Sequence, residues 1–227
     1  PVKAYMEAHI EQGPVLEDSG NTIGAVTGIQ GSRRFQVNIT GESAHAGTAP
    51  LKSRRDALQA ALRCLSDLNT VMADPDDILR YTVGKLIIAP NSPNAVASGA
   101  EFSIDLRHPD EAVLERLSKE IGEACTKAAP PCDIEVMQTF RKTPSDFTPE
   151  IVNAVESSAQ ALGFPAIQLP SGAFHDAGMM ASFCPSAMIF VPCAGGISHN
   201  EAEYATASDL AAGAKVLAAC LVDLAAE

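Results

Sequence analysis

The sequence has five histidines, whose side chains can bind metals, transfer protons or contact a substrate. Two of them suit metal binding. His9 lies in AHIEQGP, between the end of a helix or strand and a Gly-Pro turn, and His199 lies in GGISHNEAEY, after a continuous apolar run. Residues at the carboxyl ends of strands in an α/β sheet line the ligand crevice. Imidazole is the commonest ligand for zinc-like metals, and carboxylates complete such sites. Taken singly, each histidine is more simply a polar residue near a loop.

The other three histidines allow different chemistry. His45 lies among small residues in GESAHAGTAP, where its ring has room to approach a substrate, although a surface turn is the simpler interpretation. His175 follows a Gly turn in SGAFHDAG, and Asp176 is expected to cap the helix that begins there. His108 and Asp110 have the H-x-D spacing of a metal pair, but a proline separates them and Asp110 serves better as the start of a helix.

An arginine and an asparagine are candidates for binding an acidic substrate. Arg107 ends a predicted strand on its polar face, and Asn94 lies in the turn APNSPNA. Arginine binds a carboxylate through two parallel hydrogen bonds, and an amide can orient a neighbouring carbonyl. Solvated residues at strand ends are the alternative. Arg33 and Arg34 are further candidates that the sequence does not distinguish from a surface pair.

The composition limits the class of protein. Of 227 residues, 46% are hydrophobic, which provides a packed core and excludes disorder. The formal net charge of −12 disfavours a general nucleic-acid binder. No apolar run reaches the roughly 18 residues of a membrane span, so no membrane partner is expected. The six cysteines include no CxxC and predict small buried side chains in a reducing, cytoplasmic setting.

The distribution of charge divides the chain into three segments. Residues 28–142 contain 14 of the 16 basic residues and carry a net charge of −1, whereas residues 1–27 carry −3 and residues 143–227 carry −8. The two acidic flanks resemble each other and differ from the segment between them. An inserted domain produces such a pattern. We therefore expect one domain from 1–27 with 143–227, and a second domain at 28–142.

Apolar periodicity predicts the elements of the middle segment. In order they are a strand at 35–39, a helix at 58–68 after Ser53, strands at 80–88 and 102–106, a helix at 113–124 and a strand at 134–136. Asp110 and Glu111 suit the positive N-terminal end of the second helix. The order β-α-β-β-α-β is that of the ferredoxin-like sandwich, an α+β fold with an antiparallel sheet and both helices on one face.

The flanks predict an α/β domain. The expected elements are a helix at 149–162, a strand near 166–169, a helix from about 175, a strand at 186–192 and a closing helix at 206–225. The run SAMIFVP is typical of a strand buried on both faces. Together these elements predict part of a catalytic domain with a mixed or parallel sheet.

Six strings of the sequence together resemble a known family. They are HIEQGPVLE, GIQGSRRFQVNITGESAHAGTAP, RRDAL, PNAVASGAEFSIDLRHPD, SGAFHDA and SHNEAEY. They resemble the amidase, hydantoinase and carbamoylase branch of the M20 metallopeptidase family, in the family's order, from residue 5 to about residue 220. That branch includes N-carbamoyl-L-amino-acid hydrolases, allantoate amidohydrolases and β-ureidopropionases. The resemblance implies a metal-dependent amidohydrolase that cleaves the C–N bond of N-carbamoyl amino acids or allantoate-like ureido acids.

The resemblance also implies roles for single residues. His9 looks like the ligand of one of two divalent ions, zinc or manganese, and His199 like the ligand of the other. His45 looks like the histidine that stabilises the substrate oxyanion from the partner subunit, because the inserted domain is the family's lid and mediates homodimerisation. The residues implied to bind the small-molecule substrate are Gln12, Asn94, Arg107, which would hold the carboxylate, and His175.

The sequence departs from the family at two points. Phe174 stands where the family usually has glycine, so a change in the accepted substrate size is expected. The family's H-x-D metal pair and Glu-Glu pair, one of whose glutamates is the general base, do not occur in matching context. Since the chain also begins at Pro1, we expect a C-terminal fragment that is inactive alone and binds metal weakly. The alternatives are an M20 aminoacylase or dipeptidase, and a non-catalytic dimerisation or binding module.

Overall fold

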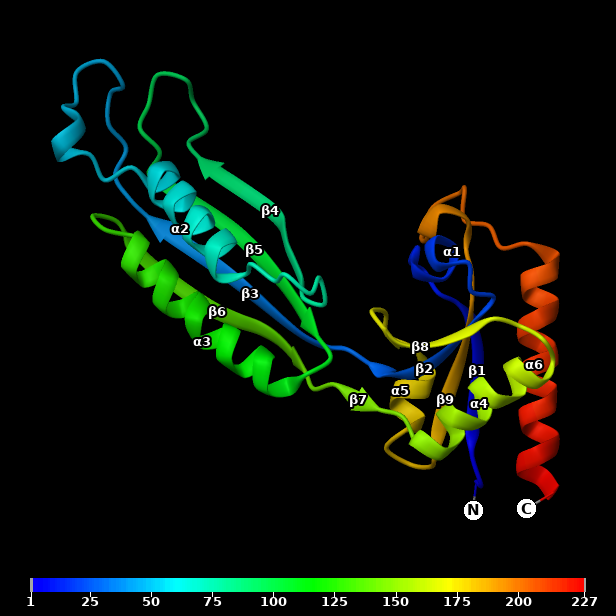
Figure 1. The fold of residues 1–227 in the computed structure, drawn as a ribbon. Helices are drawn as coiled ribbons and strands as arrows, with labels where there is room; N and C mark the ends of the chain where they lie inside the picture. The colour runs from blue at the N-terminus through cyan, green and yellow to red at the C-terminus, as the bar shows by residue number, and fades with distance from the viewer. Residues whose placement is uncertain (1, 227) are drawn as a thin grey trace. The chain divides into compact units, whose positions relative to one another are not determined.

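The computed structural model describes residues 2–226, which form two compact units (Figure 1). The body unit comprises the chain up to Gln30 and again from Pro144, and the insert unit comprises Gly31–Thr143. No helix in the described part of the chain has the length and apolar character that a membrane crossing requires. The predicted fold class, an α/β body with an inserted α+β domain, is confirmed.

A five-stranded mixed sheet is the centre of the body unit. Its strands are β1 (Tyr5–Ile10), β2 (Ile23–Ile29), β7 (Ser145–Asp146), β8 (Ala166–Ser171) and β9 (Ser186–Val191). The order is β1-β9-β2-β7, with β8 also paired to β2. β1 runs parallel to β9 and β8 runs parallel to β2, whereas β9 and β2 are antiparallel. Since β1 and β9 are parallel neighbours, their carboxyl ends and the loops that follow them meet at one edge of the sheet.

Helices complete the body core. They are α1 (Val15–Ser19), α4 (Pro149–Ala161), α5 (Asp176–Met180) and α6 (Ala207–Ala226), with a short 3-10 turn at Ala194–Gly196. Every residue of β9 is buried, as the continuous apolar run predicted. Val155 of α4 and Val216 of α6 are fully buried in the same core as Ile189 of β9.

Strand β2 was not predicted, and its glycines explain why. Six of its seven residues, IGAVTGI, are buried, so no polar alternation marks it. A Cβ at Gly24 would lie 2.6 Å from Leu169 Cδ2, and one at Gly28 would lie 2.5 Å from the carbonyl oxygen of Ser145. The glycines therefore allow neighbouring strands to approach closely. Because glycine replaces the β-branched residues that are typical of strands, the sequence did not predict this one.

The insert unit contains a four-stranded antiparallel sheet with two helices on one face (Figure 1). Its elements are β3 (Gly31–Thr40), α2 (Ala57–Val71), β4 (Arg80–Ala89), β5 (Gly99–His108), α3 (Glu111–Ala128) and β6 (Asp133–Lys142), after a 3-10 turn at Leu51–Ser53. The strand order is β4-β5-β3-β6. Phe102 and Leu106 of β5 are fully buried with Leu68 of α2 and Ile121 of α3. The alternating residues predicted to face the core do so.

The first turns of three helices show how well capping was predicted. Asp110 caps α3 by accepting a hydrogen bond from Ala112 N, as expected. α2 is capped by Asp56 rather than begun at Ser53. The prediction that Asp176 caps α5 is wrong: His175 occupies the N-cap without a side-chain cap, and the Ala177 N–H donates to Glu7 Oε2 at 2.8 Å. A carboxylate from strand β1 therefore accepts a first-turn N–H of this helix. No local sequence pattern indicates this contact.

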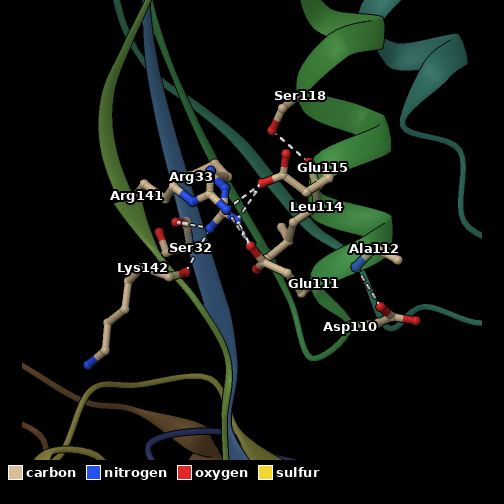
Figure 2. A network of polar contacts seen from close by, with 10 residues as sticks. All are labelled: Ser32, Arg33, Asp110, Glu111, Ala112, Leu114, Glu115, Ser118, Arg141 and Lys142. Atoms are coloured by element: carbon tan, nitrogen blue, oxygen red, sulfur yellow. Dashed lines mark hydrogen bonds and ion pairs between the residues drawn. The ribbon is translucent and has the colours of Figure 1, made fainter.

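Among residues 2–226, Arg33 is the largest fully buried side chain, and it is not part of a surface pair (Figure 2). Its guanidinium donates to the carbonyl oxygen of Lys142 at 2.8 Å and to Glu111 and Glu115 on α3. Arg141 of β6 pairs with the same two glutamates at 2.9 Å. Arg33 therefore joins β3, β6 and α3. Arg34, by contrast, is exposed and pairs with Asp105.

Candidate metal and substrate site

His9 lies one residue before the carboxyl end of β1, and a hydrogen bond defines its tautomer. Its Nδ1 lies 2.8 Å from the carbonyl oxygen of Ile10. Because a carbonyl oxygen only accepts, Nδ1 carries the hydrogen, and in the neutral ring Nε2 carries the lone pair. A metal-binding histidine typically has this arrangement, with the second nitrogen donating to a carbonyl or carboxylate. His9 is therefore suited to ligate a metal through Nε2.

His175 packs directly against His9. The two rings meet edge to face with centroids 4.7 Å apart, and the His175 side chain is 3% exposed. Its Nε2 lies 3.0 Å from Ser171 Oγ, and its Nδ1 lies 3.9 Å from Glu7 Oε1. The structure thus brings together two of the predicted site residues. Phe174, next to His175, is 39% exposed.

Glu7 is a residue of this cluster that the sequence analysis missed. It lies two residues before His9 on β1, so the two side chains share one face of the strand. One carboxylate oxygen of Glu7 faces His175 and the other accepts the Ala177 N–H. The spacing of Glu7 and His9 could have predicted that their side chains share a face of β1. No local sequence pattern, however, indicates that α5 packs against Glu7.

The loops that follow β1 and β9 are joined by side-chain hydrogen bonds. Gln12 Nε2 donates to Ser198 Oγ at 2.8 Å. Ser198 Oγ in turn donates to Glu203 Oε2 at 2.9 Å, and the His199 backbone N–H donates to the same oxygen at 3.0 Å. Gln12 and His199 are therefore brought into one network, in which the side-chain amide of Gln12 bonds to the His199 loop.

Glu203 was also missed by the sequence analysis, although it lies within the string SHNEAEY. Hydrogen bonds from Ser198 and from the His199 N–H hold the pKa of Glu203 below its usual value, and the nearby imidazoles of His199 and His9 lower it further. This carboxylate therefore lies beside His199 in the loop after β9.

The donor atoms at this edge of the sheet fit part of a metal site. The imidazole of His9 has a defined tautomer, and His199 lies on the loop that Glu203 holds. Within residues 2–226, however, no group of three or more His, Cys, Asp or Glu side chains is placed to hold one ion. A catalytic zinc ion usually has three protein ligands and an open position. The described residues therefore provide ligands suited to a metal but not a complete set.

In the insert unit, His45 and Asn94 lie on two loops that pair with each other. His45 forms an isolated antiparallel bridge with Ala95, and the Ala46 N–H donates to the Asn94 carbonyl oxygen at 3.0 Å. His45 Nδ1 accepts a hydrogen bond from the Gly47 N–H at 3.0 Å. In the neutral ring, Nε2 of this exposed histidine therefore carries the hydrogen and is a donor.

Arg107 lies at the other end of the insert sheet. Its Nε donates to Asp105 Oδ1 at 2.8 Å and its Nη2 to Asp105 Oδ2 at 3.2 Å. Arg34 donates to Oδ2 of the same carboxylate at 2.9 Å. Burial raises the pKa of Asp105, but the hydrogen bonds from Arg107 and Arg34 outweigh this and hold it below its usual value.

A single insert unit does not bring Arg107 together with His45 and Asn94. The His45 and Asn94 loops adjoin the Gly99 end of β5, and Arg107 is eight residues further along that strand. At about 3.3 Å per residue, this is a separation of roughly 26 Å. A substrate the size of an amino acid cannot span that distance.

The fold and these side chains define a class: an α/β protein with histidines suited to metal binding beside its sheet and a ferredoxin-like domain inserted in its chain. The chain belongs to peptidase family M20/M25/M40, whose family model matches residues 1–223. The resemblance to the amidase, hydantoinase and carbamoylase branch is confirmed by the relatives that the chain matches.

Three relatives illustrate this similarity. An N-carbamoyl-L-amino-acid amidohydrolase of Rhizobium meliloti is 39% identical over 94% of this chain and 52% of its own length. An allantoate amidohydrolase of Bacillus subtilis is 37% identical over 99% of this chain and 55% of its own. The crystal structure of an amidase of the hydantoinase/carbamoylase family from Burkholderia multivorans is 40% identical, with a TM-score of 0.95 over 100% of this chain and 56% of its own. The chain thus spans about half the length of the relatives it matches.

Proposed function

We propose that this chain is part of a metal-dependent amidohydrolase that cleaves the C–N bond of N-carbamoyl amino acids or of allantoate-like ureido acids. The observation that carries the proposal is the placement of His9 and the His199 loop at the carboxyl ends of neighbouring parallel strands, with His9 in the tautomer that suits metal binding. The activities named for the similar proteins supply the substrate class.

His9 and His199 each hold one of two divalent ions, zinc or manganese, in this proposal. When bound, such ions polarise the ureido carbonyl and lower the pKa of a bound water. His175 and Gln12 are the proposed substrate-binding residues beside these two histidines. His175 is held against His9 by Ser171, and Gln12 is held by the loop of His199. The products are the free amino or ureido acid and ammonia, with carbon dioxide from carbamoyl substrates.

His45 is the proposed oxyanion-stabilising residue. Because its Nδ1 accepts from the Gly47 N–H, its Nε2–H is directed outward as a donor to the substrate carbonyl oxygen. A hydrogen bond that strengthens as negative charge develops on that oxygen lowers the barrier. The exposure of His45 leaves its ring accessible to a substrate.

Arg107 is the proposed carboxylate clamp, with Asn94 as a second substrate-binding residue. The guanidinium can hold a planar carboxylate through two hydrogen bonds, which orients the substrate at the scissile bond. In the structure it already binds Asp105 in this way. This pairing supports a role for Arg107 as a carboxylate-binding group.

The separation of Arg107 from His45 and Asn94 supports a homodimer formed through the insert unit. A site that uses all three residues requires His45 and Asn94 from one subunit and Arg107 from the other. The outer strands of the sheet expose the apolar side chains that a partner would cover, namely Leu86 and Ile87 on β4 and Met137 and Phe140 on β6. Six free, buried cysteines support a reducing cytoplasmic location.

A substrate screen of the full-length protein tests the function. We expect ammonia release from N-carbamoyl amino acids or from allantoate after loading with zinc or manganese. Turnover of N-acetyl amino acids or dipeptides, without ureido turnover, would instead identify an aminoacylase or dipeptidase. Absence of all turnover together with dimer formation would favour a non-catalytic dimerisation module.

A further inference from the structure

Two residues in the loops after β1 and β9 have a backbone conformation that side chains disfavour. Gln12 has φ 60° and His199 has φ 56°. The left-handed region is sparsely populated by residues other than glycine, asparagine and aspartate, so surrounding contacts must hold both residues there. Gln12 lies three residues after the predicted ligand His9, in the loop that follows β1, and His199 is itself a predicted ligand. Conformations of this kind concentrate at functional sites.

Glu203 supplies the contacts that hold the His199 loop. Its Oε2 accepts both the His199 backbone N–H at 3.0 Å and the Ser198 hydroxyl at 2.9 Å. The Glu203 N–H donates back to the Asn200 carbonyl oxygen at 3.0 Å, which closes the turn and places the carboxylate beside His199. One charged acceptor therefore bonds two successive residues of the loop.

The same network reaches the loop after β1. Gln12 Nε2 donates to Ser198 Oγ at 2.8 Å, so Gln12, Ser198 and Glu203 form a continuous chain of hydrogen bonds. Because Gln12 lies three residues after His9, this chain links the segments of the two metal-binding histidines. A network of this kind limits independent movement of the two loops.

We propose that Glu203 is a positioning residue: it fixes the backbone of His199, and through Ser198 and Gln12 it fixes the distance between the two metal-binding loops. This inference rests on the proposed function, since it assigns His199 to a metal. Glu203 does not touch substrate in this role. Its effect is exerted on the orientation of His199 before any ion binds.

The first test uses the full-length protein in its metal-free form. Replacing the carboxylate in Glu203→Ala removes the acceptor for the His199 N–H, so amide hydrogen exchange at residues 197–200 should accelerate by about tenfold or more. Glu201→Ala is the matched control, because Glu201 is an exposed carboxylate of the same loop whose side chain makes no hydrogen bond or ion pair within residues 2–226. Equal exchange in the two variants would overturn the proposal.

The second test uses the full-length protein and measures the affinity for zinc and manganese by calorimetry. Loss of an outer-shell partner of a metal ligand typically lowers affinity by about 10- to 100-fold. We expect such a loss for one of the two ions in Glu203→Gln, partial recovery in Glu203→Asp, and none in Glu201→Gln. A fall in kcat with little change in KM should accompany it. Wild-type affinity for both ions in Glu203→Gln would refute the positioning role.

These measurements separate the two claims. If the wild-type protein binds two ions and Glu203→Gln weakens one, but no ureido substrate is turned over, the proposed function fails and the role of Glu203 stands. If the wild-type protein hydrolyses ureido substrates and Glu203→Gln binds both ions normally, the role of Glu203 fails and the function stands.

Discussion

The two units of this protein differ in whether the described residues complete their central polar cluster. In the insert unit, both helices cover one face of the sheet, and the buried Arg33 is paired with Glu111 and Glu115. Both units expose large apolar side chains, such as Leu86 and Ile87 in the insert unit and Phe183 and Val222 in the body unit. The predicted metal ligands of the body unit form no complete cluster within residues 2–226.

The two units therefore call for different tests. The insert unit has the features of an independent fold, so its internal contacts can be tested by stability. The body unit, in a chain that spans about half of its relatives' length, is therefore best tested in the longer protein.

The largest effect is expected from Arg33→Ala. The substitution opens a cavity between β3, β6 and α3 and removes the hydrogen bonds of Arg33 to Lys142, Glu111 and Glu115, although the two glutamates keep Arg141 as a partner. Truncating a large buried side chain to alanine typically costs about 2–5 kcal/mol. Denaturant unfolding, with hydrogen exchange to resolve the units, should show this loss in the insert unit alone. Arg34→Ala, which removes an exposed pair with Asp105, should cost less than about 1 kcal/mol. Similar losses from the two substitutions would contradict the account.

The second prediction concerns Arg107 in the full-length enzyme. Arg107→Lys keeps the charge but loses the fork that holds a carboxylate, so transition-state binding should weaken by about 1.5–3 kcal/mol. The measurement is kcat/KM for a substrate with a carboxylate. An unchanged value would refute the clamp.

A smaller effect is expected from the helix caps of the insert unit. Asp56 and Asp110 accept first-turn N–H groups of α2 and α3. Replacing either by alanine should lower the free energy of unfolding by about 0.5–2 kcal/mol. Asp176→Ala in the body unit is the comparison, since Asp176 was expected to cap α5 but Glu7 takes the Ala177 N–H. A cap-sized loss from Asp176→Ala would restore the sequence-based expectation.

The smallest predicted effect concerns how the free energy of unfolding changes with pH. Arg107 and Arg34 hold the pKa of Asp105 below its usual value in the folded state, despite partial burial. The unfolded chain therefore binds this proton first, and the stabilisation is present above about pH 4 and is lost as the pH falls through the folded pKa. Urea unfolding between pH 5 and pH 2 should show a shallower decline for Asp105→Asn than for the wild type. An identical decline would show that Asp105 makes no contribution.

The sequence predicted the insert unit more completely than the body unit, for a physical reason. The insert sheet has one buried face, so its strands alternate and its helices are amphipathic, and every strand and helix was placed. In the body, β9 is buried on both faces and was recognised by its apolar run. β2, with Gly24 and Gly28 at close strand contacts, carries neither signal.

The candidate site was predictable only where single residues carry the chemistry. Histidine and arginine are conspicuous in their motifs, so His9, His45 and Arg107 could be proposed from the sequence. Glu203 accepts the His199 N–H within one turn, and its link to Gln12 of the loop after β1 forms only through Ser198. Glu7 accepts the Ala177 N–H, which requires α5 to pack against β1. The burial of Arg33 likewise requires β3 to meet α3 and β6, which lie far along the chain from it. Contacts between distant segments cannot be derived from local patterns.

Metal content of the full-length protein tests the central claim most directly. After removal of metal with a chelator and reloading with zinc or manganese, we expect two bound ions per chain and hydrolysis of ureido substrates. His9→Ala and His199→Ala should each reduce the content to about one tightly bound ion per chain and abolish turnover, because each histidine is assigned to a different ion. Two tightly bound ions and normal turnover in both variants would contradict the assignment of His9 and His199 to the metal site.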